Sequence, residues 1–189
     1  MRADARANHD HLLAVAGPVI AERGVDASMR DIARQAGVGL ATLLRHFPTR
    51  ESLLEALLRS QFDELTDRAA EVETAKTAEE ALLDWLRAFV ACTTDYRGVV
   101  NSMVSAIEDP ESALHSSCVA MRAAGTRLLT RAQAEGVART DLDGADLFAL
   151  GASLAWLGDQ PALRPRAGHL FDVVMSAVLA GPEEAARRP

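Results

Sequence analysis

Apolar residues recur at helical spacing along most of the chain. In the first such segment, Leu12, Ala16 and Val19 share one face of a helix. Runs of β-branched or aromatic residues are few, so the pattern favours helices over strands. It predicts an all-α fold of about nine helices, at residues 6–23, 28–36, 40–46, from 49 past 65, 78–94, 99–108, 111–135, 144–157 and 165–180. Gly17-Pro18 is expected to kink or interrupt the first helix, because proline removes a backbone hydrogen bond.

Residues 28–47 have the pattern of two short helices joined by a glycine turn. Ser28 can cap the first helix, and Asp31 lies near the positive end of its dipole. Gly37 stands where a tight turn between helices needs a positive φ. Small side chains and a hydroxyl on the second helix permit close approach to base edges in the major groove. The segment therefore predicts a helix-turn-helix that reads DNA, and a helical hairpin in a core is the alternative. The residues expected to point outward are Gly39, Leu40, Thr42, Arg45 and His46.

Charge is distributed unevenly between the two parts of the chain, whose net charge is −7. Residues 1–60 hold 8 Arg and 7 Asp or Glu, a balance of +1, and residues 61–189 hold 12 Lys or Arg and 20 Asp or Glu, a balance of −8. Because attraction to phosphate is local, this asymmetry is compatible with a DNA-facing head on an acidic body. Ordinary charge variation would also account for it.

Residues 11–58 resemble the N-terminal signature of the TetR family of transcriptional regulators. The resemblance lies in the runs Ala21-Glu-Arg-Gly, Ser28-Met-Arg-Asp-Ile-Ala-Arg-Gln-Ala-Gly-Val-Gly and Thr42-Leu-Leu-Arg-His-Phe-Pro-Thr-Arg-Glu-Ser-Leu. The segments Trp85-Leu-Arg-Ala-Phe-Val and Leu170-Phe-Asp-Val-Val resemble a subgroup with an SbtR-like C-terminal domain. The resemblance implies a homodimer with a three-helix DNA-binding head at residues 1–48 and a ligand-binding and dimerisation domain at residues 49–189. It further implies a repressor that a small molecule releases from a palindromic operator.

The family's DNA contacts can be carried over to matching positions. Ser28 would meet a phosphate, and Thr49 and Arg50 would hold the DNA backbone from the start of the next helix. Two positions depart from the family pattern: Leu44 stands where tyrosine is common, and Ala41 where glycine is usual. Leu44 removes a hydroxyl that often reaches a phosphate. The residues expected in or beside the groove are Gly39, Leu40, Thr42, Arg45 and His46.

Aromatic and sulfur-containing residues of the second part could line a site for a moderately apolar effector. Trp85, Phe89 and Cys92 fall at i, i+4 and i+7 on one helix face. An apolar stripe at this spacing is more often core, which is the alternative interpretation. The candidate ligand-binding residues are Trp85, Phe89, Cys92, Tyr96, Met103, Met121 and Trp156.

The last two predicted helices are apolar around most of their circumference. Such surfaces exceed what one small body can bury, so we expect a four-helix interface with a second subunit. The alternative is that both helices pack within one chain. The candidate dimerisation residues are Leu147, Gly151, Ala155, Phe171, Val174 and Val178.

Motifs for catalysis, metal binding or membrane insertion are not recognisable. The five histidines show no metal-ligand spacing, and phosphate-binding glycine loops, GxSxG and HExxH are absent from the sequence. We therefore expect no enzyme activity, metal or cofactor. Cys92 and Cys118 form no CxxC, and no apolar run approaches the roughly 20 residues that span a bilayer. These features favour a cytoplasmic protein, and the helix-turn-helix together with the TetR resemblance implies a ligand-responsive DNA-binding repressor. A helical ligand-binding dimer that has lost specific DNA binding is the alternative.

Overall fold

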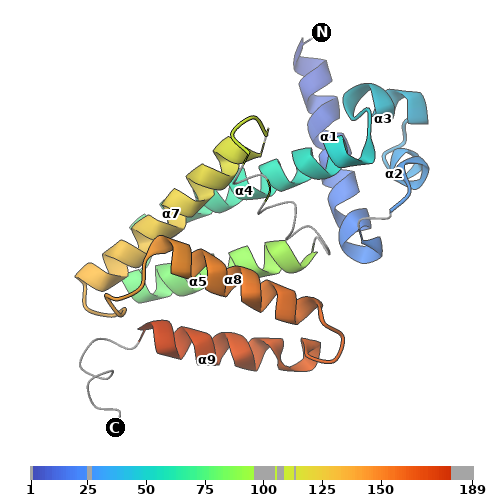
Figure 1. The fold of residues 1–189 in the computed structure, drawn as a ribbon. Coiled ribbons are helices and arrows are strands. Elements are labelled where there is room, and N and C mark those ends of the chain that lie inside the picture. The colour runs from blue at the N-terminus through green and yellow to red at the C-terminus, as the bar shows by residue number, and fades with distance from the viewer. Residues whose placement is uncertain (1, 25–26, 96–104, 106–108, 113, 180–189) are drawn as a thin grey trace. The chain divides into compact units, whose positions relative to one another are not determined.

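Helices make up the regular secondary structure of the computed structural model, which describes residues 2–24, 27–95, 105, 109–112 and 114–179. Within these residues there are eight α-helices and one 3-10 helix, and no strand (Figure 1). The predicted all-α class is confirmed. The expected helix at residues 99–108 falls almost entirely outside the described residues. None of the described helices is both long and apolar enough to cross a membrane.

The chain divides into two units. The first comprises Met1–Gln61 with Asp95–His115, and the second comprises Phe62–Thr94 with Ser116–Pro189. The division falls within helix α4, which extends over Arg50–Ala75 and so begins in one unit and ends in the other. The head was expected to comprise residues 1–48. The first unit extends about three helical turns further, along α4, and also includes residues 95–115.

Helix α1 (Arg2–Arg23) is continuous through Pro18, and the expected interruption is wrong. Proline removes one backbone donor, but its neighbours Ala16, Val19 and Ile20 are buried, and their packing favours the helix on both sides of it. The helix ends at Gly24, whose φ of 76° and bond from its N–H to the Ile20 carbonyl (2.7 Å) form a glycine stop.

Helices α2 (Met29–Gln35) and α3 (Leu40–His46) form the predicted helix-turn-helix. Gly37 has a φ of 69°, and in the same turn the Val38 N–H donates to the carbonyl of Ala33 at 3.0 Å. The expected conformation of the glycine turn is therefore confirmed. Apolar side chains on the inner faces of both helices are buried. They are Ile32, Ala33, Leu43 and Phe47.

The second unit contains the end of α4, helix α5 (Ala78–Asp95), most of α7 (His115–Ala134), and the C-terminal helices α8 (Gly144–Asp159) and α9 (Ala167–Leu179). Helix α7 begins four residues after its expected start, since residues 109–112 form a turn in which the Asp109 carboxylate accepts from the N–H of Glu111 (3.0 Å). A 3-10 turn, Arg164–Arg166, precedes α9.

Two glycines allow helices α7 and α8 to approach aromatic rings of α5. The Trp85 ring stacks on Phe89 with centroids 5.7 Å apart, and its Nε1 donates to the carbonyl of Leu65 at 2.9 Å. A Cβ on Gly125 would lie 2.7 Å from Cζ3 of Trp85, and one on Gly151 would lie 2.6 Å from Cε1 of Phe89. Both contacts are closer than a side chain tolerates, so glycine is required at these positions by close packing.

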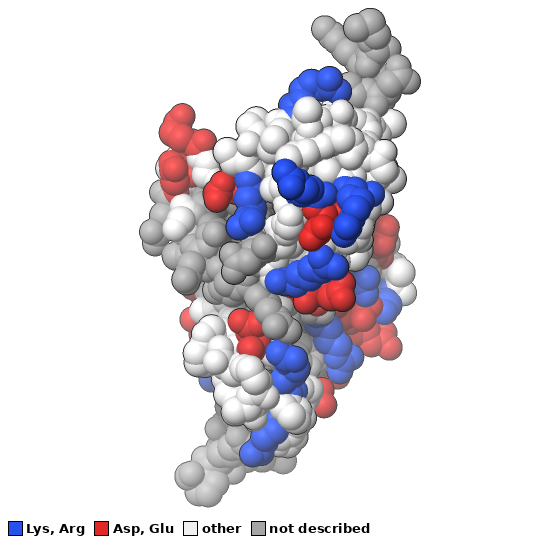
Figure 2. Space-filling view, turned by 90° about the vertical axis from the view of Figure 1, so that its right-hand side faces the viewer, with Lys and Arg blue, Asp and Glu red and all other residues white. Residues whose placement is uncertain are grey.

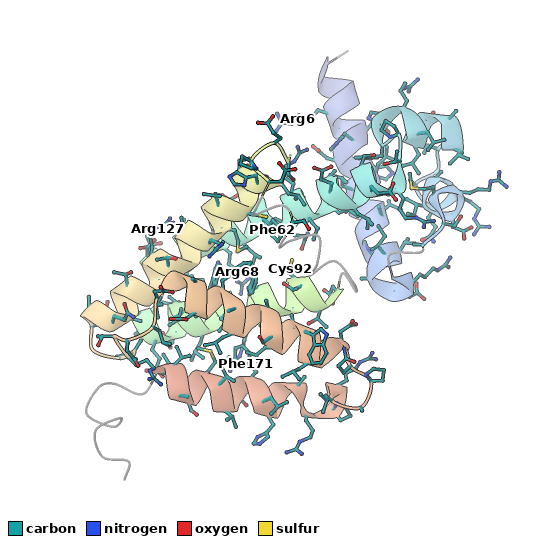
Figure 3. The ribbon with its side chains drawn as sticks, viewed as in Figure 1. Arg6, Phe62, Arg68, Cys92, Arg127 and Phe171 are labelled. Carbon is teal, nitrogen blue, oxygen red and sulfur yellow. The ribbon has the colours of Figure 1, made fainter. Side chains whose placement is uncertain are left out.

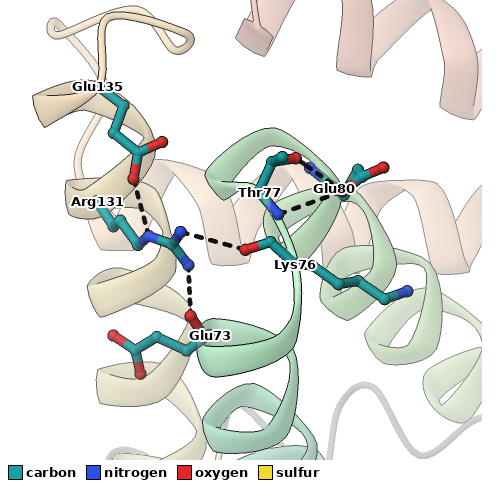
Figure 4. A network of polar contacts seen from close by, with 6 residues as sticks. All are labelled: Glu73, Lys76, Thr77, Glu80, Arg131 and Glu135. Carbon is teal, nitrogen blue, oxygen red and sulfur yellow. Dashed lines mark hydrogen bonds and ion pairs between the residues drawn. The ribbon is translucent and has the colours of Figure 1, made fainter.

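An arginine of α7 binds the C-terminal end of α4 (Figure 4). The Arg131 guanidinium donates to the carbonyl oxygens of Glu73 (2.6 Å) and Lys76 (3.2 Å), and its Nε donates to the Glu135 carboxylate (2.9 Å). The last carbonyls of a helix lack partners within the helix. Arg131 therefore supplies donors to groups that the helix itself leaves unbonded.

Candidate nucleic-acid interface

The outer surface of α3 carries the side chains that could read DNA. Leu43 is fully buried, so Ala41 and Arg45, on the other side of the helix, are exposed. Thr42 is half-buried on one flank of this surface. The other flank consists of Leu40, which is half-buried, and Leu44, which is exposed; we call this pair the apolar flank. Gly39 is exposed and is the N-cap of α3.

Ser28 and Thr49 are N-terminal capping residues with exposed side chains. The Ser28 Oγ accepts from the N–H of Asp31 at 3.4 Å, and the Thr49 Oγ1 accepts from the N–H of Ser52 at 3.0 Å. A hydroxyl that accepts in this way keeps its own hydrogen, which it can donate to a phosphate oxygen. Each residue could therefore cap its helix and contact a phosphate at the same time.

The helix-turn-helix is more basic than the first unit as a whole. Residues 28–50 contain four Arg and one Asp, a net charge of 4 − 1 = +3. That acid, Asp31, lies within 3.3 Å of Arg23 and 2.9 Å of Arg34, so two guanidinium groups offset its charge. In Figure 2, Lys and Arg side chains are spread over the visible face, with acidic side chains between them. The segment thus presents a local positive surface despite the chain's negative net charge.

His46 lies against α1 and faces outward less than expected. Its Nε2 accepts from the side-chain amide of Asn8 at 3.1 Å, and its ring lies near those of His9 and Phe47. A second contact joins α1 to the helix-turn-helix, since the His11 Nε2 donates to the carbonyl of Ala36 (3.2 Å). These contacts attach α1 to the helix-turn-helix and were not predicted, because they join residues 25 and 38 positions apart. His46 is consequently better placed to position α3 than to read a base.

The expected ligand-binding residues have different environments. Trp85, Phe89, Met121 and Cys92, the last of them labelled in Figure 3, are buried in the second unit. Trp156 was expected to face the same interior, but 55% of its surface is exposed, and that expectation is wrong. Two further candidates, Tyr96 and Met103, lie outside the described residues.

The α8 and α9 residues expected to face a second subunit are largely covered by their own chain. Gly151 packs against the Phe89 ring. The guanidinium carbon of Arg87 lies over the Phe171 ring, 5.2 Å from the ring centroid. The expectation that these side chains form a subunit surface therefore requires correction. Val174 is half-buried. The buried members are Leu147, Gly151, Ala155, Phe171 and Val178.

The large hydrophobic side chains that remain exposed on these two helices are Trp156, at 55%, and Val173, at 50%. Sequence periodicity could not identify them, because α8 is apolar on nearly every side. The face of α8 that is buried carries Gly151 against α5, together with Leu147, Leu154 and Ala155.

Metal ligands do not cluster in the described part of the chain: it contains no group of three or more His, Cys, Asp or Glu residues able to hold an ion. The two cysteines are buried and form no disulfide. Burial raises the pKa of the Cys118 thiol to about 11, so the thiol is protonated near neutral pH.

Two family models match the chain. Residues 12–57 match the model for bacterial regulatory proteins of the tetR family, and residues 77–178 match the model described as the C-terminal domain of SbtR-like transcriptional regulators. The two matches lie on either side of the middle of α4.

Curated relatives match a shorter stretch. The chain is 34% identical over 89 residues to the HTH-type transcriptional repressor KstR2 of Rhodococcus jostii, an alignment that covers 47% of this chain and 41% of that protein. It is 37% identical over 75 residues to KstR2 of Mycolicibacterium smegmatis, and this alignment covers 39% of this chain and 37% of that protein. The aligned part thus spans less than half the length of either relative.

Solved structures match over nearly the whole chain. A TetR transcriptional regulator from Streptomyces coelicolor is 34% identical, with a TM-score of 0.72, and the match covers 92% of this chain and 99% of that one. A TetR regulatory protein from Mycobacterium vanbaalenii is 31% identical, with a TM-score of 0.69 and coverage of 95% and 99%.

Proposed function

Because the chain belongs to the TetR family of transcriptional regulators and has an SbtR-like C-terminal domain, we propose that it represses transcription by binding a palindromic operator as a homodimer. The observation that carries this proposal is the outer surface of α3. Arg45 is exposed there beside Thr42, and α3 contains no acidic residue. Two relatives that match the chain are named as transcriptional repressors, which supports repression over activation.

The expected result with wild-type protein is sequence-specific retardation of the DNA immediately upstream of its gene. Arginines on two heads would contact several phosphates, so affinity should fall by about 10³-fold between 50 and 200 mM salt. The measurement is a gel-shift titration against an unrelated duplex of equal length at each salt concentration. Equal retardation of both duplexes would refute the proposal and favour a helical dimer that has lost specific DNA binding.

The second subunit is proposed to cover the exposed faces of α8 and α9. Trp156 shares its face of α8 with Ala149 and Ser153, at spacings of three to seven residues, and both small side chains are exposed. Val173 and Ala177 form a corresponding exposed face on α9. Two copies of this pair of helices would make a self-complementary four-helix interface. The resulting dimer would have two DNA-binding heads, one for each of two half-sites about 34–36 Å apart.

The Trp156→Glu/Val173→Glu double variant is expected to sediment as a monomer where the wild type sediments as a dimer. Symmetry would bring like charges together in an apolar interface, which opposes association. Sedimentation equilibrium measures the mass. The control is Val119→Glu on α7, where the valine is comparably exposed at 47% and dimerisation should persist. A double variant that stays dimeric would place the interface elsewhere.

A small, moderately apolar effector is proposed to bind in the second unit and weaken operator binding. The buried aromatic and sulfur side chains of this unit support an apolar binding region, for which the candidates among the described residues are Trp85, Phe89, Cys92 and Met121. Tyr96 and Met103, outside the described residues, stay candidates. An effector weakens DNA binding only if it prefers the conformation with lower DNA affinity. Adding compounds to the retardation assay would measure this preference as lost retardation.

A further inference from the structure

An exposed leucine lies on the surface of α3 that is proposed to face DNA. Leu44 is 37% exposed, and it belongs to the few large hydrophobic side chains within the described residues that are exposed to this degree. The others, Val119, Trp156 and Val173, lie outside the helix-turn-helix. Leu44 therefore differs from the rest of its motif, whose large apolar side chains are buried or half-buried.

The surroundings of Leu44 suit close contact with a DNA groove. Arg45 follows it and is exposed, so a charge that could hold the DNA lies beside it. Ala41, also exposed, adds only a methyl group between the apolar flank and Thr42, so the helix can approach the bases closely. Leu40, one turn earlier, extends the apolar flank along the helix.

The chemistry of leucine restricts what Leu44 can recognise. Its side chain has no donor or acceptor, so it can bond neither a phosphate nor a base edge. Among the groups that the four bases present in the major groove, the thymine 5-methyl is the apolar one. We propose that Leu44 packs against the methyl group of a thymine and thereby makes thymine a preferred base in each half-site. This inference rests on the proposed operator binding.

The experiment compares thymine with deoxyuridine, which differs by that methyl group alone. A preferred sequence is first selected with wild-type protein from a random duplex library, and each thymine is then replaced by deoxyuridine symmetrically in both half-sites. At one position the replacement should weaken wild-type binding by about tenfold, because burial of each of two methyl groups contributes roughly threefold to fourfold. Affinities are measured by gel shift or anisotropy.

The Leu44→Ala variant should bind the thymine and deoxyuridine duplexes equally at that position. Comparing both proteins on both duplexes isolates the contact from any general loss of affinity. Val119→Ala, which also shortens an exposed apolar side chain, should keep the wild-type discrimination. If Leu44→Ala discriminates at every position as the wild type does, the thymine contact is refuted while operator binding stands. If selection yields no preferred sequence, the proposed function fails and this inference fails with it.

Discussion

The Thr42→Ala/Arg45→Ala double variant is expected to lose sequence-specific DNA retardation while retaining its fold and its dimeric mass. Arg45 is exposed on the outer surface of α3, and a good bidentate contact from arginine to guanine discriminates by about 1–3 kcal/mol. The contact would be made twice in a dimer. Specific affinity should therefore fall by about 100-fold or more, since each 1.4 kcal/mol is a factor of ten.

Gel shift against the selected operator measures this loss, and circular dichroism with sedimentation verifies fold and mass. The matched control is Arg127→Ala, which removes an exposed arginine from α7 in the second unit, as Figure 3 shows. It should change specific affinity much less. Undiminished retardation by the double variant would show that a surface other than α3 reads the DNA.

The Gly125→Ala variant is expected to lower the free energy of unfolding by about 2 kcal/mol. Alanine normally stabilises a helix relative to glycine by roughly 0.5–1 kcal/mol, so the expected sign is opposite to helix propensity. The reason is the Trp85 ring, whose Cζ3 would lie 2.7 Å from the new Cβ. That ring is held by its stacking on Phe89 and by its bond to the Leu65 carbonyl, so it has little freedom to move away.

Urea and thermal denaturation followed by circular dichroism measure this change, with a fall in Tm of about 4–8 °C expected for a chain of this size. Gly168→Ala is the control, because a Cβ at that position in α9 meets nothing within 4 Å. It should leave stability unchanged or raise it by up to about 1 kcal/mol. Equal stability of the two variants would mean that Trp85 can yield and that the contact at Gly125 is not restrictive.

Elements fixed by local chemistry could be predicted from the sequence. The helix-turn-helix depends on a cap at Ser28, a positive φ at Gly37 and an inward face that contains Leu43. Each depends on residue types or spacing within a short stretch of the chain: the cap and the turn follow from residue type, and the inward face follows from periodicity. The assignment of outward residues on α3 followed from the same periodicity. Gly39 and Arg45 are exposed, whereas Leu40, Thr42 and His46 are half-buried, and His46 also contacts α1.

Features that depend on distant contacts could not be predicted. Pro18 predicted a kinked or interrupted helix, but α1 is uninterrupted, and the burial of the neighbours of Pro18 favours the helix on both sides of it. Helix α8 has apolar residues on every side, so its sequence did not indicate that Gly151 faces inward and Trp156 outward. The bonds from Arg131 join it to carbonyls 55 and 58 positions away, and backbone carbonyls have no signature in the sequence.

The capping hydroxyls of Ser28 and Thr49 have a consequence for which substitutions the chain can accept. Aspartate caps a helix about as well as serine or threonine, so selection for stability alone would accept all three at these positions. A carboxylate has no hydrogen to donate and would repel a phosphate. Under the proposed function, aspartate at either position would yield a protein that is folded and stable yet impaired in binding its operator.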